Sequence, residues 1–104
     1  MNMEQQQKLH EIIAGHSFKE QLEQAIEEAS EFILAAQKLK RFPQEQKHFD
    51  DLLEETADML IMAEQMHCYL GVERVEKMID YKLDRELKRM QGKRSAEKWQ
   101  VLRI

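Results

Sequence analysis

The stretch that decides the fold is LLEETADMLIMAEQMHCYL, residues 52–70. Wound as a helix at about 100° per residue, it carries a continuous apolar stripe. Five side chains form this stripe: Leu52, Met59, Ala63, Met66 and Leu70. Further apolar side chains flank it on both sides. A helix that is apolar nearly all round is usually buried on several sides. In a chain of 104 residues, we therefore expect this helix to be buried within an oligomer.

Helical patterns also occupy most of the chain on either side of this stretch. The four predicted helices span residues 3–14, 18–40, about 50–70 and 72–91. Residues that favour helix ends separate or follow them: Gly15, Pro43, Gly71 and Gly92. Ser17 and Glu20 form a capping-box pattern before the second helix, and Asp50 or Asp51 is expected to cap the third. The sequence therefore predicts an all-α fold, a four-helix bundle with short connections.

Domain number and location follow from length and composition. The chain is long enough for one domain, which we place at residues 1–104 with its core at about 18–91. Charged residues make up 35%, and the net charge is −4, so no general attraction to nucleic acid or to anionic membranes is expected. No apolar run reaches about 18 residues, and the first residues lack the apolar core of a signal peptide. With a single cysteine, Cys68, a cytoplasmic location is expected.

Two acidic residues interrupt the apolar surface of the 52–70 helix. Glu55 and Asp58 fall on the same side of the helix as Met62 and Tyr69. Burying two ionised carboxylates without a partner costs roughly several kcal/mol for each group. We therefore expect a positive group, either a metal ion or a basic side chain, to compensate them.

A second acidic cluster lies on the 18–40 helix. Glu28 and Glu31 are three residues apart and project to the same side, and Glu27 is also near Glu31. If the two helices pack antiparallel, each supplies a pair of carboxylates to one site. Carboxylate oxygens are ligands that suit hard cations such as Mg²⁺ or Mn²⁺, which in turn favour attack of water on a phosphoryl group.

The simpler interpretation of these acids is a solvated surface. Glutamate pairs are common on exposed helix faces, and the ExxE spacing by itself is more often structural than functional. The ExxD pair on an apolar helix changes that balance. We therefore interpret the two motifs together as a functional site.

The two motifs together resemble those of the all-α nucleoside triphosphate pyrophosphohydrolases, the superfamily that includes MazG, dimeric dUTPases and phosphoribosyl-ATP pyrophosphatase. The segments that carry the resemblance are AIEEASEF, residues 25–32, and LEETADMLI, residues 53–61. The small single-domain MazG-like proteins of bacteria and phages look most similar, over about residues 18–90. The longer two-domain organisation of full MazG is absent.

The resemblance implies Mg²⁺-dependent hydrolysis of a nucleoside triphosphate to the monophosphate and pyrophosphate, by a homodimer or homotetramer. A dNTP or a modified NTP is the expected substrate, in a house-cleaning role. Carried over from the family, the metal ligands are Glu28, Glu31, Glu55 and Asp58. Glu27 is the expected residue that positions or deprotonates water.

Family members also hold phosphates with basic residues. Lys82, Arg85 and Arg89 lie along one stripe of the 72–91 helix and are the candidates here. The alternative is a solvated basic face that pairs with nearby acids. A second basic patch follows the first acidic motif: Lys38, Lys40 and Arg41. Such residues more often complement the C-terminal end of a helix.

Some features depart from the family pattern or point elsewhere. Phe18 is the only aromatic residue near the place where many members stack a base, so base recognition is not assigned. Glu64 and His67 form an ExxH pattern found in di-iron proteins, but they fall roughly opposite Glu55 and Asp58. Trp99 is expected to pack on a neighbouring subunit rather than to cover a pocket.

Two alternative functions remain open from the sequence. One is a non-catalytic helical interaction module, in which the acids are solvated and the 52–70 helix serves assembly. The other is a superfamily member with a narrow substrate, such as a dUTPase or a phosphoribosyl-ATP pyrophosphatase.

Overall fold

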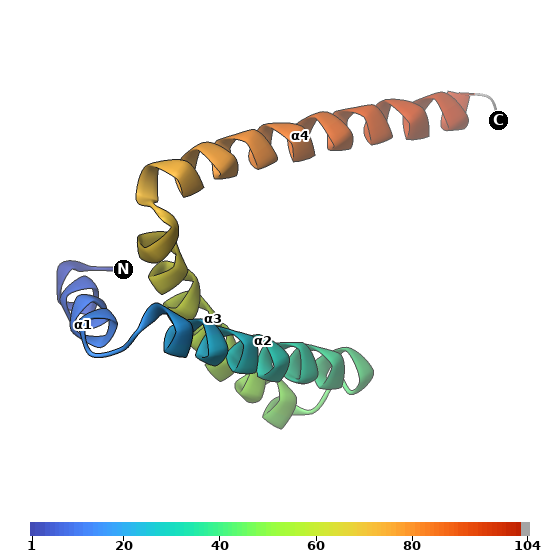
Figure 1. The fold of residues 1–104 in the computed structure, drawn as a ribbon. Coiled ribbons are helices and arrows are strands. Elements are labelled where there is room, and N and C mark those ends of the chain that lie inside the picture. The colour runs from blue at the N-terminus through green and yellow to red at the C-terminus, as the bar shows by residue number, and fades with distance from the viewer. Residues whose placement is uncertain (103–104) are drawn as a thin grey trace. The chain divides into compact units, whose positions relative to one another are not determined.

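The described part of the chain is entirely helical (Figure 1). The structure is a computed structural model that describes the backbone of residues 1–102 and the side chains of residues 1–93. Its helices are α1 (Met3–Ala14), α2 (Phe18–Arg41), α3 (Gln46–Leu70) and α4 (Val72–Leu102). No strand occurs within residues 1–102, so the predicted all-α class is confirmed.

Local capping explains where the first helices begin. The Ser17 hydroxyl accepts a hydrogen bond from the Glu20 backbone N–H at 3.1 Å, and the Glu20 carboxylate accepts one from the Ser17 N–H at 3.3 Å. This capping box is the one predicted for α2. The hydrogen bond from the Ser17 side chain is also the main reason that the pKa of Glu20 lies below its ordinary range. Asn2 and Gln5 form the same arrangement before α1.

Two predicted helix boundaries were wrong. α3 begins at Gln46, about one turn before the predicted cap at Asp50 or Asp51. The first turn of α3 is polar, so its sequence resembles that of a loop. A hydrogen bond from the Gln46 side chain to the Asp50 carboxylate, at 2.9 Å, spans this turn. α4 also continues through Gly92 to Leu102. One glycine costs only about 1 kcal/mol relative to alanine, which the good helix formers around it offset.

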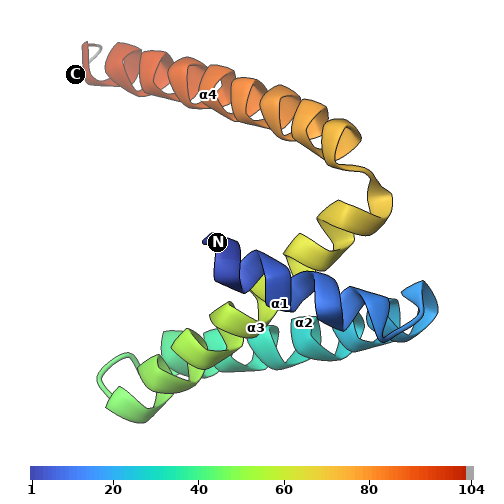
Figure 2. The ribbon, with the colours of Figure 1, turned by 90° about the vertical axis from the view of Figure 1, so that its left-hand side faces the viewer.

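The first three helices form one compact unit, residues Met1–Tyr69. α2 and α3 run antiparallel and are joined by the short connection 42–45, while α1 crosses them (Figure 2). The buried apolar side chains of the described chain are few, namely Leu9, Ala35 and Met62. Two polar side chains, Gln21 and Gln65, are buried as well. The unit therefore has a thin core with an amide pair inside it.

The second compact unit begins at Leu70, the last residue of α3, and contains α4. Gly71 lies between α3 and α4 with a φ of 105°, a left-handed conformation that favours glycine. The Trp99 side chain lies outside the side chains that the structure describes, so its packing on a neighbouring subunit stays a prediction. The bundle arrangement and the single domain stay predictions as well. Among the described residues, no helix has the length and apolar character needed to cross a membrane.

Candidate metal centre

Antiparallel packing of α2 and α3 brings the two acidic motifs together. Glu28 and Glu31 come from α2, and Glu55 comes from α3. Each of these glutamates offers one carboxylate oxygen, and the three oxygens lie within 4.8 Å of one another. Among the side chains of residues 1–93, this is the only group of three or more acidic, histidine or cysteine residues with such spacing. The predicted meeting of the two motifs is therefore present in the structure.

The fourth predicted ligand, Asp58, lies beside this group rather than within it. Its carboxylate is not one of the three that converge within 4.8 Å. It is nevertheless near enough for its negative charge to raise the pKa of both Glu28 and Glu55. We call Glu28, Glu31, Glu55 and Asp58 together the acidic cluster.

Burial and mutual repulsion both disfavour ionisation within the acidic cluster. Removal from water is the main cause that raises the pKa of Glu55, followed by the charges of Glu31, Asp58 and Glu28. Burial is also the main cause that raises the pKa of Glu28, with added repulsion from its acidic neighbours.

Two carboxylate oxygens of the acidic cluster are buried without a hydrogen-bond partner. These atoms are Oε2 of Glu28 and Oε2 of Glu55. The other oxygen of Glu28 accepts a hydrogen bond from the Gln24 side chain at 2.9 Å. Buried polar atoms are usually paired, so the two unpaired oxygens require an explanation. A cation between α2 and α3 provides one.

The residues of the acidic cluster fit a hard divalent cation. All four offer carboxylate oxygens, the donors that Mg²⁺ and Mn²⁺ prefer over sulfur. The unpaired oxygens of Glu28 and Glu55 offer free ligand atoms, and a cation would neutralise the repulsion that, after burial, raises the pKa values of both groups. Gln24, which orients Glu28, was not predicted from sequence. Its i, i+4 spacing to Glu28 was the available signal.

Glu27 has a different environment from the acidic cluster. Its side chain is exposed and is not part of the converging group, although its charge adds to the raised pKa of Glu28. It therefore borders the cluster from the solvent side.

The predicted phosphate-binding residues lie in the second unit. Lys82, Arg85 and Arg89 are all on α4, at spacings that place them along one stripe. The Arg85 guanidinium lies 5.8 Å from the centre of the Tyr81 ring, within the range of a cation–π contact. Their role in binding phosphate stays a prediction.

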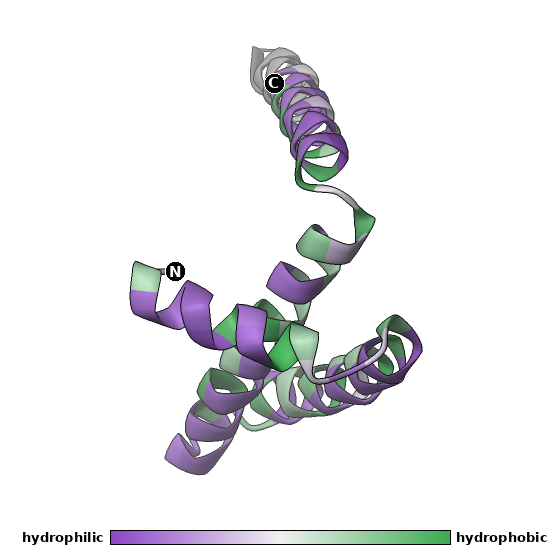
Figure 3. Cartoon of the chain, turned by 60° about the vertical axis from the view of Figure 1, so that its left-hand side comes forward, coloured by the Kyte–Doolittle hydropathy of each residue, from purple (hydrophilic) through white to green (hydrophobic). Residues whose placement is uncertain are grey.

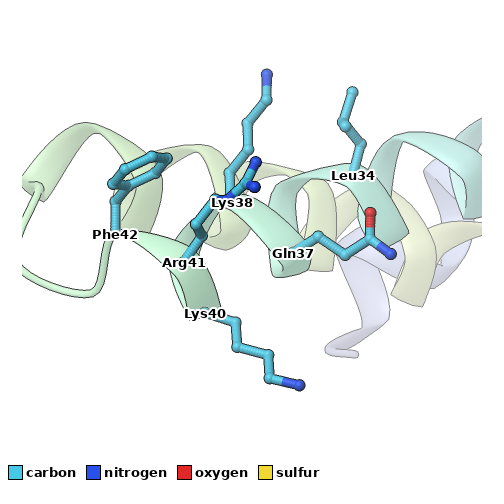
Figure 4. A pocket seen from close by; sticks show the side chains of 6 residues that line it. All are labelled: Leu34, Gln37, Lys38, Lys40, Arg41 and Phe42. Carbon is cyan, nitrogen blue, oxygen red and sulfur yellow. The ribbon is translucent and has the colours of Figure 1, made fainter.

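The second basic patch surrounds a groove of about 590 Å³ at the end of α2. Figure 4 shows Lys38, Arg41 and Phe42 on one side of the helix, whereas Lys40 points away from them. Lys38, Lys40 and Arg41 all lie in the last turn, where positive charge complements the helix dipole. The structure thus provides a local structural reason for this patch.

The remaining candidates do not join the acidic cluster. Glu64 and His67 face each other on α3, with Oε2 and Nδ1 3.7 Å apart. The Phe18 ring packs against Tyr69, with ring centres 4.9 Å apart, and so ties the start of α2 to the end of α3. Among the described residues, the di-iron pattern therefore gathers no third ligand.

Comparison with known proteins identifies no relative. No protein-family model, no curated protein and no solved structure matches this chain. The acidic cluster and its surroundings thus carry the functional interpretation.

Proposed function

We propose that this chain is a Mg²⁺-dependent nucleoside triphosphate pyrophosphohydrolase that works in the cytoplasm. The observation that carries the proposal is the acidic cluster, in which three glutamate oxygens from two helices converge within 4.8 Å. Two of its carboxylates also keep a buried oxygen without a partner. A solvated acidic surface would not be expected to leave carboxylate oxygens both buried and unpaired.

The proposed substrate follows from the charge and from the motif resemblance. A divalent cation on carboxylates retains affinity for phosphate oxygens, and Mg²⁺ sites commonly bind protein carboxylates and substrate phosphates together. Among phosphate compounds, we choose a nucleoside triphosphate because the EExxE and ExxD motifs resemble those of MazG-like proteins. A dNTP or a modified NTP is the proposed substrate.

Each residue of the site has a proposed task. Glu28, Glu31, Glu55 and Asp58 would hold the cation, which would neutralise charge on the phosphates and lower the pKa of a bound water. Gln24 holds the Glu28 carboxylate in place through its hydrogen bond. Glu27 accepts a proton from the attacking water as the water oxygen bonds to phosphorus. The anhydride bond between the α- and β-phosphates breaks, and Lys82, Arg85 and Arg89 bind the phosphate oxygens.

A homodimer or homotetramer is part of the proposal because the first unit leaves large apolar side chains uncovered. Ile26 on α2 is 64% exposed, and Leu53 and Leu60 on α3 are 64% and 62% exposed. Apolar (green) and polar (purple) residues alternate along the helices of this unit in Figure 3. A chain with few buried apolar side chains gains stability by covering such residues.

The test is pyrophosphate release from a panel of canonical and modified NTPs and dNTPs, including dUTP and phosphoribosyl-ATP. Each nucleotide is incubated with Mg²⁺, with EDTA, and with the Asp58→Asn variant. The matched control is Glu23→Gln, which removes an exposed acid from α2 outside the cluster. We expect Mg²⁺-dependent release that Asp58→Asn lowers about 100-fold or more and Glu23→Gln preserves.

The panel also separates the alternatives. Release from dUTP or phosphoribosyl-ATP alone would identify a narrow-substrate enzyme of the same chemistry. No release from any nucleotide, by a folded protein that also binds no Mg²⁺, would favour a non-catalytic interaction module.

A further inference from the structure

A pair of amide side chains is buried between α2 and α3. Gln65 is 1% exposed, the lowest value among the buried side chains of the described residues, and Gln21 is 6% exposed. Gln21 Nε2 donates a hydrogen bond to Gln65 Oε1 at 2.6 Å, while Gln65 Nε2 faces the sulfur of Met62 at 3.7 Å. The two helices therefore meet through a polar contact in a core that is otherwise apolar.

Such a pair adds little to stability compared with apolar side chains of the same size. Removing two amides from water offsets most of what their hydrogen bond contributes. A buried polar pair instead disfavours every arrangement in which one amide loses its partner. In helical assemblies, this is the best-attested way in which buried polar residues fix register.

The positions of the pair match those of the acidic cluster. Glu28 lies seven residues after Gln21, and Asp58 lies seven residues before Gln65. Glu31 lies ten residues after Gln21, and Glu55 lies ten residues before Gln65. Since each residue advances a helix by about 1.5 Å, antiparallel helices aligned at the pair are also aligned at both acidic levels, about 10.5 and 15 Å away.

The alignment has little tolerance. A shift of one helical turn moves one helix by about 5.4 Å along the other. The three glutamate oxygens converge within 4.8 Å, so such a shift would separate Glu55 of α3 from Glu28 and Glu31 of α2. An interaction that fixes the register of α2 against α3 therefore also fixes the distances within the acidic cluster.

We propose that Gln21 and Gln65 are a positioning pair, whose hydrogen bond sets the register of α2 against α3 and thereby assembles the acidic cluster. The register role stands on the geometry alone. The consequence for metal affinity rests on the proposed function.

The test replaces both amides with methionine, which has a similar volume and no amide group. Register is measured as the distance between spin labels at the exposed positions Glu23 on α2 and Glu54 on α3, in a Cys68→Ser background diluted with unlabelled protein. Mn²⁺ affinity is measured by its paramagnetic signal, and unfolding is followed by denaturant titration. Leu39→Met, a half-buried apolar change on α2 outside the pair and the acidic cluster, is the matched control.

We expect Gln21→Met/Gln65→Met to fold with unchanged or higher stability and to show a displaced or broadened label distance. Its dissociation constant for Mn²⁺ should rise about 10-fold or more, as when residues that orient metal ligands are lost. Leu39→Met should change neither quantity. A double variant with the original narrow distance would overturn the proposal, and so would one that fails to fold, because the pair would then serve stability.

The two readouts also separate this inference from the proposed function. If the unaltered protein binds no Mn²⁺, the metal centre is wrong. The label distance still shows whether the glutamine pair sets the register.

Discussion

Carboxylate oxygens of Glu31 in α2 and Glu55 in α3 lie within 4.8 Å of each other, although glutamate is ordinarily ionised at neutral pH. Two carboxylates this close repel each other when both are ionised, and this repulsion adds to burial in raising the pKa of Glu55. A cation bound between the two carboxylates would remove this repulsion. Several consequences can be measured.

Metal binding is expected to release protons. Burial and neighbouring charges raise the pKa values of Glu28 and Glu55, so a cation that binds the cluster must displace the protons they retain. Affinity for Mg²⁺ or Mn²⁺ should therefore increase as the pH rises above the ordinary glutamate range. Calorimetry in two buffers of different ionisation enthalpy measures the protons released. Heats that do not depend on the buffer in this pH range would contradict the prediction.

The metal-free protein should lose stability at the cluster as the pH rises. Because the pKa values of Glu28 and Glu55 are higher in the folded state, the folded protein binds more protons than the unfolded chain between the ordinary and the raised values. This contribution is complete below the ordinary pKa and is lost as pH passes through the raised pKa. Denaturant titrations from about pH 4.5 upward should show a shallower loss in Glu55→Gln than in the unaltered protein. Identical slopes would show that Glu55 is not responsible.

Removing one charge from the cluster should separate stability from activity. Asp58→Asn relieves repulsion on Glu28 and Glu55, so the metal-free variant should be at least as stable as the unaltered protein. Pyrophosphate release should fall about 100-fold or more, because a metal ligand supplies several kcal/mol of charge stabilisation. Glu23→Gln serves as the control on α2. A variant that is clearly less stable yet fully active would indicate a structural role for Asp58.

Two glycines beside or within α4 should respond in opposite directions to alanine. Gly92 lies inside the helix, and a Cβ there meets nothing within 4 Å, so Gly92→Ala should stabilise α4 by about 0.5–1 kcal/mol. Gly71 has a φ of 105°, so Gly71→Ala should destabilise the protein by about 1–2 kcal/mol. Thermal unfolding followed by circular dichroism measures both. Equal shifts of the same sign would contradict these assignments.

The helices and the acidic residues could be predicted because their signals are local. Ser17 and Glu20 mark the start of α2 through a three-residue spacing, and Gly71 marks the break after α3. The meeting of Glu31 with Glu55 required only that two helices joined by a short connection pack antiparallel. These inferences depend on spacing within one helix or between neighbouring helices.

The features that escaped prediction depend on context. The polar first turn of α3 and Gly92 within α4 are helical although each looks like a helix end when taken alone. Small favourable contributions from the helix-forming residues around them together outweigh the local cost. The Gln21–Gln65 contact joins residues 44 positions apart, and no local sequence pattern indicates that either glutamine is buried. Likewise, no spacing rule indicates that Asp58 lies beside the three converging glutamates rather than among them.

The most direct measurement of the central claim is anomalous X-ray scattering from crystals soaked in Mn²⁺. We expect an anomalous peak from Mn²⁺ between α2 and α3, in contact with carboxylate oxygens of Glu28, Glu31 and Glu55. The peak should be absent from Glu55→Gln crystals. An acidic cluster without a peak, at a Mn²⁺ concentration that supports the measured activity, would contradict the assignment of this site as the metal centre.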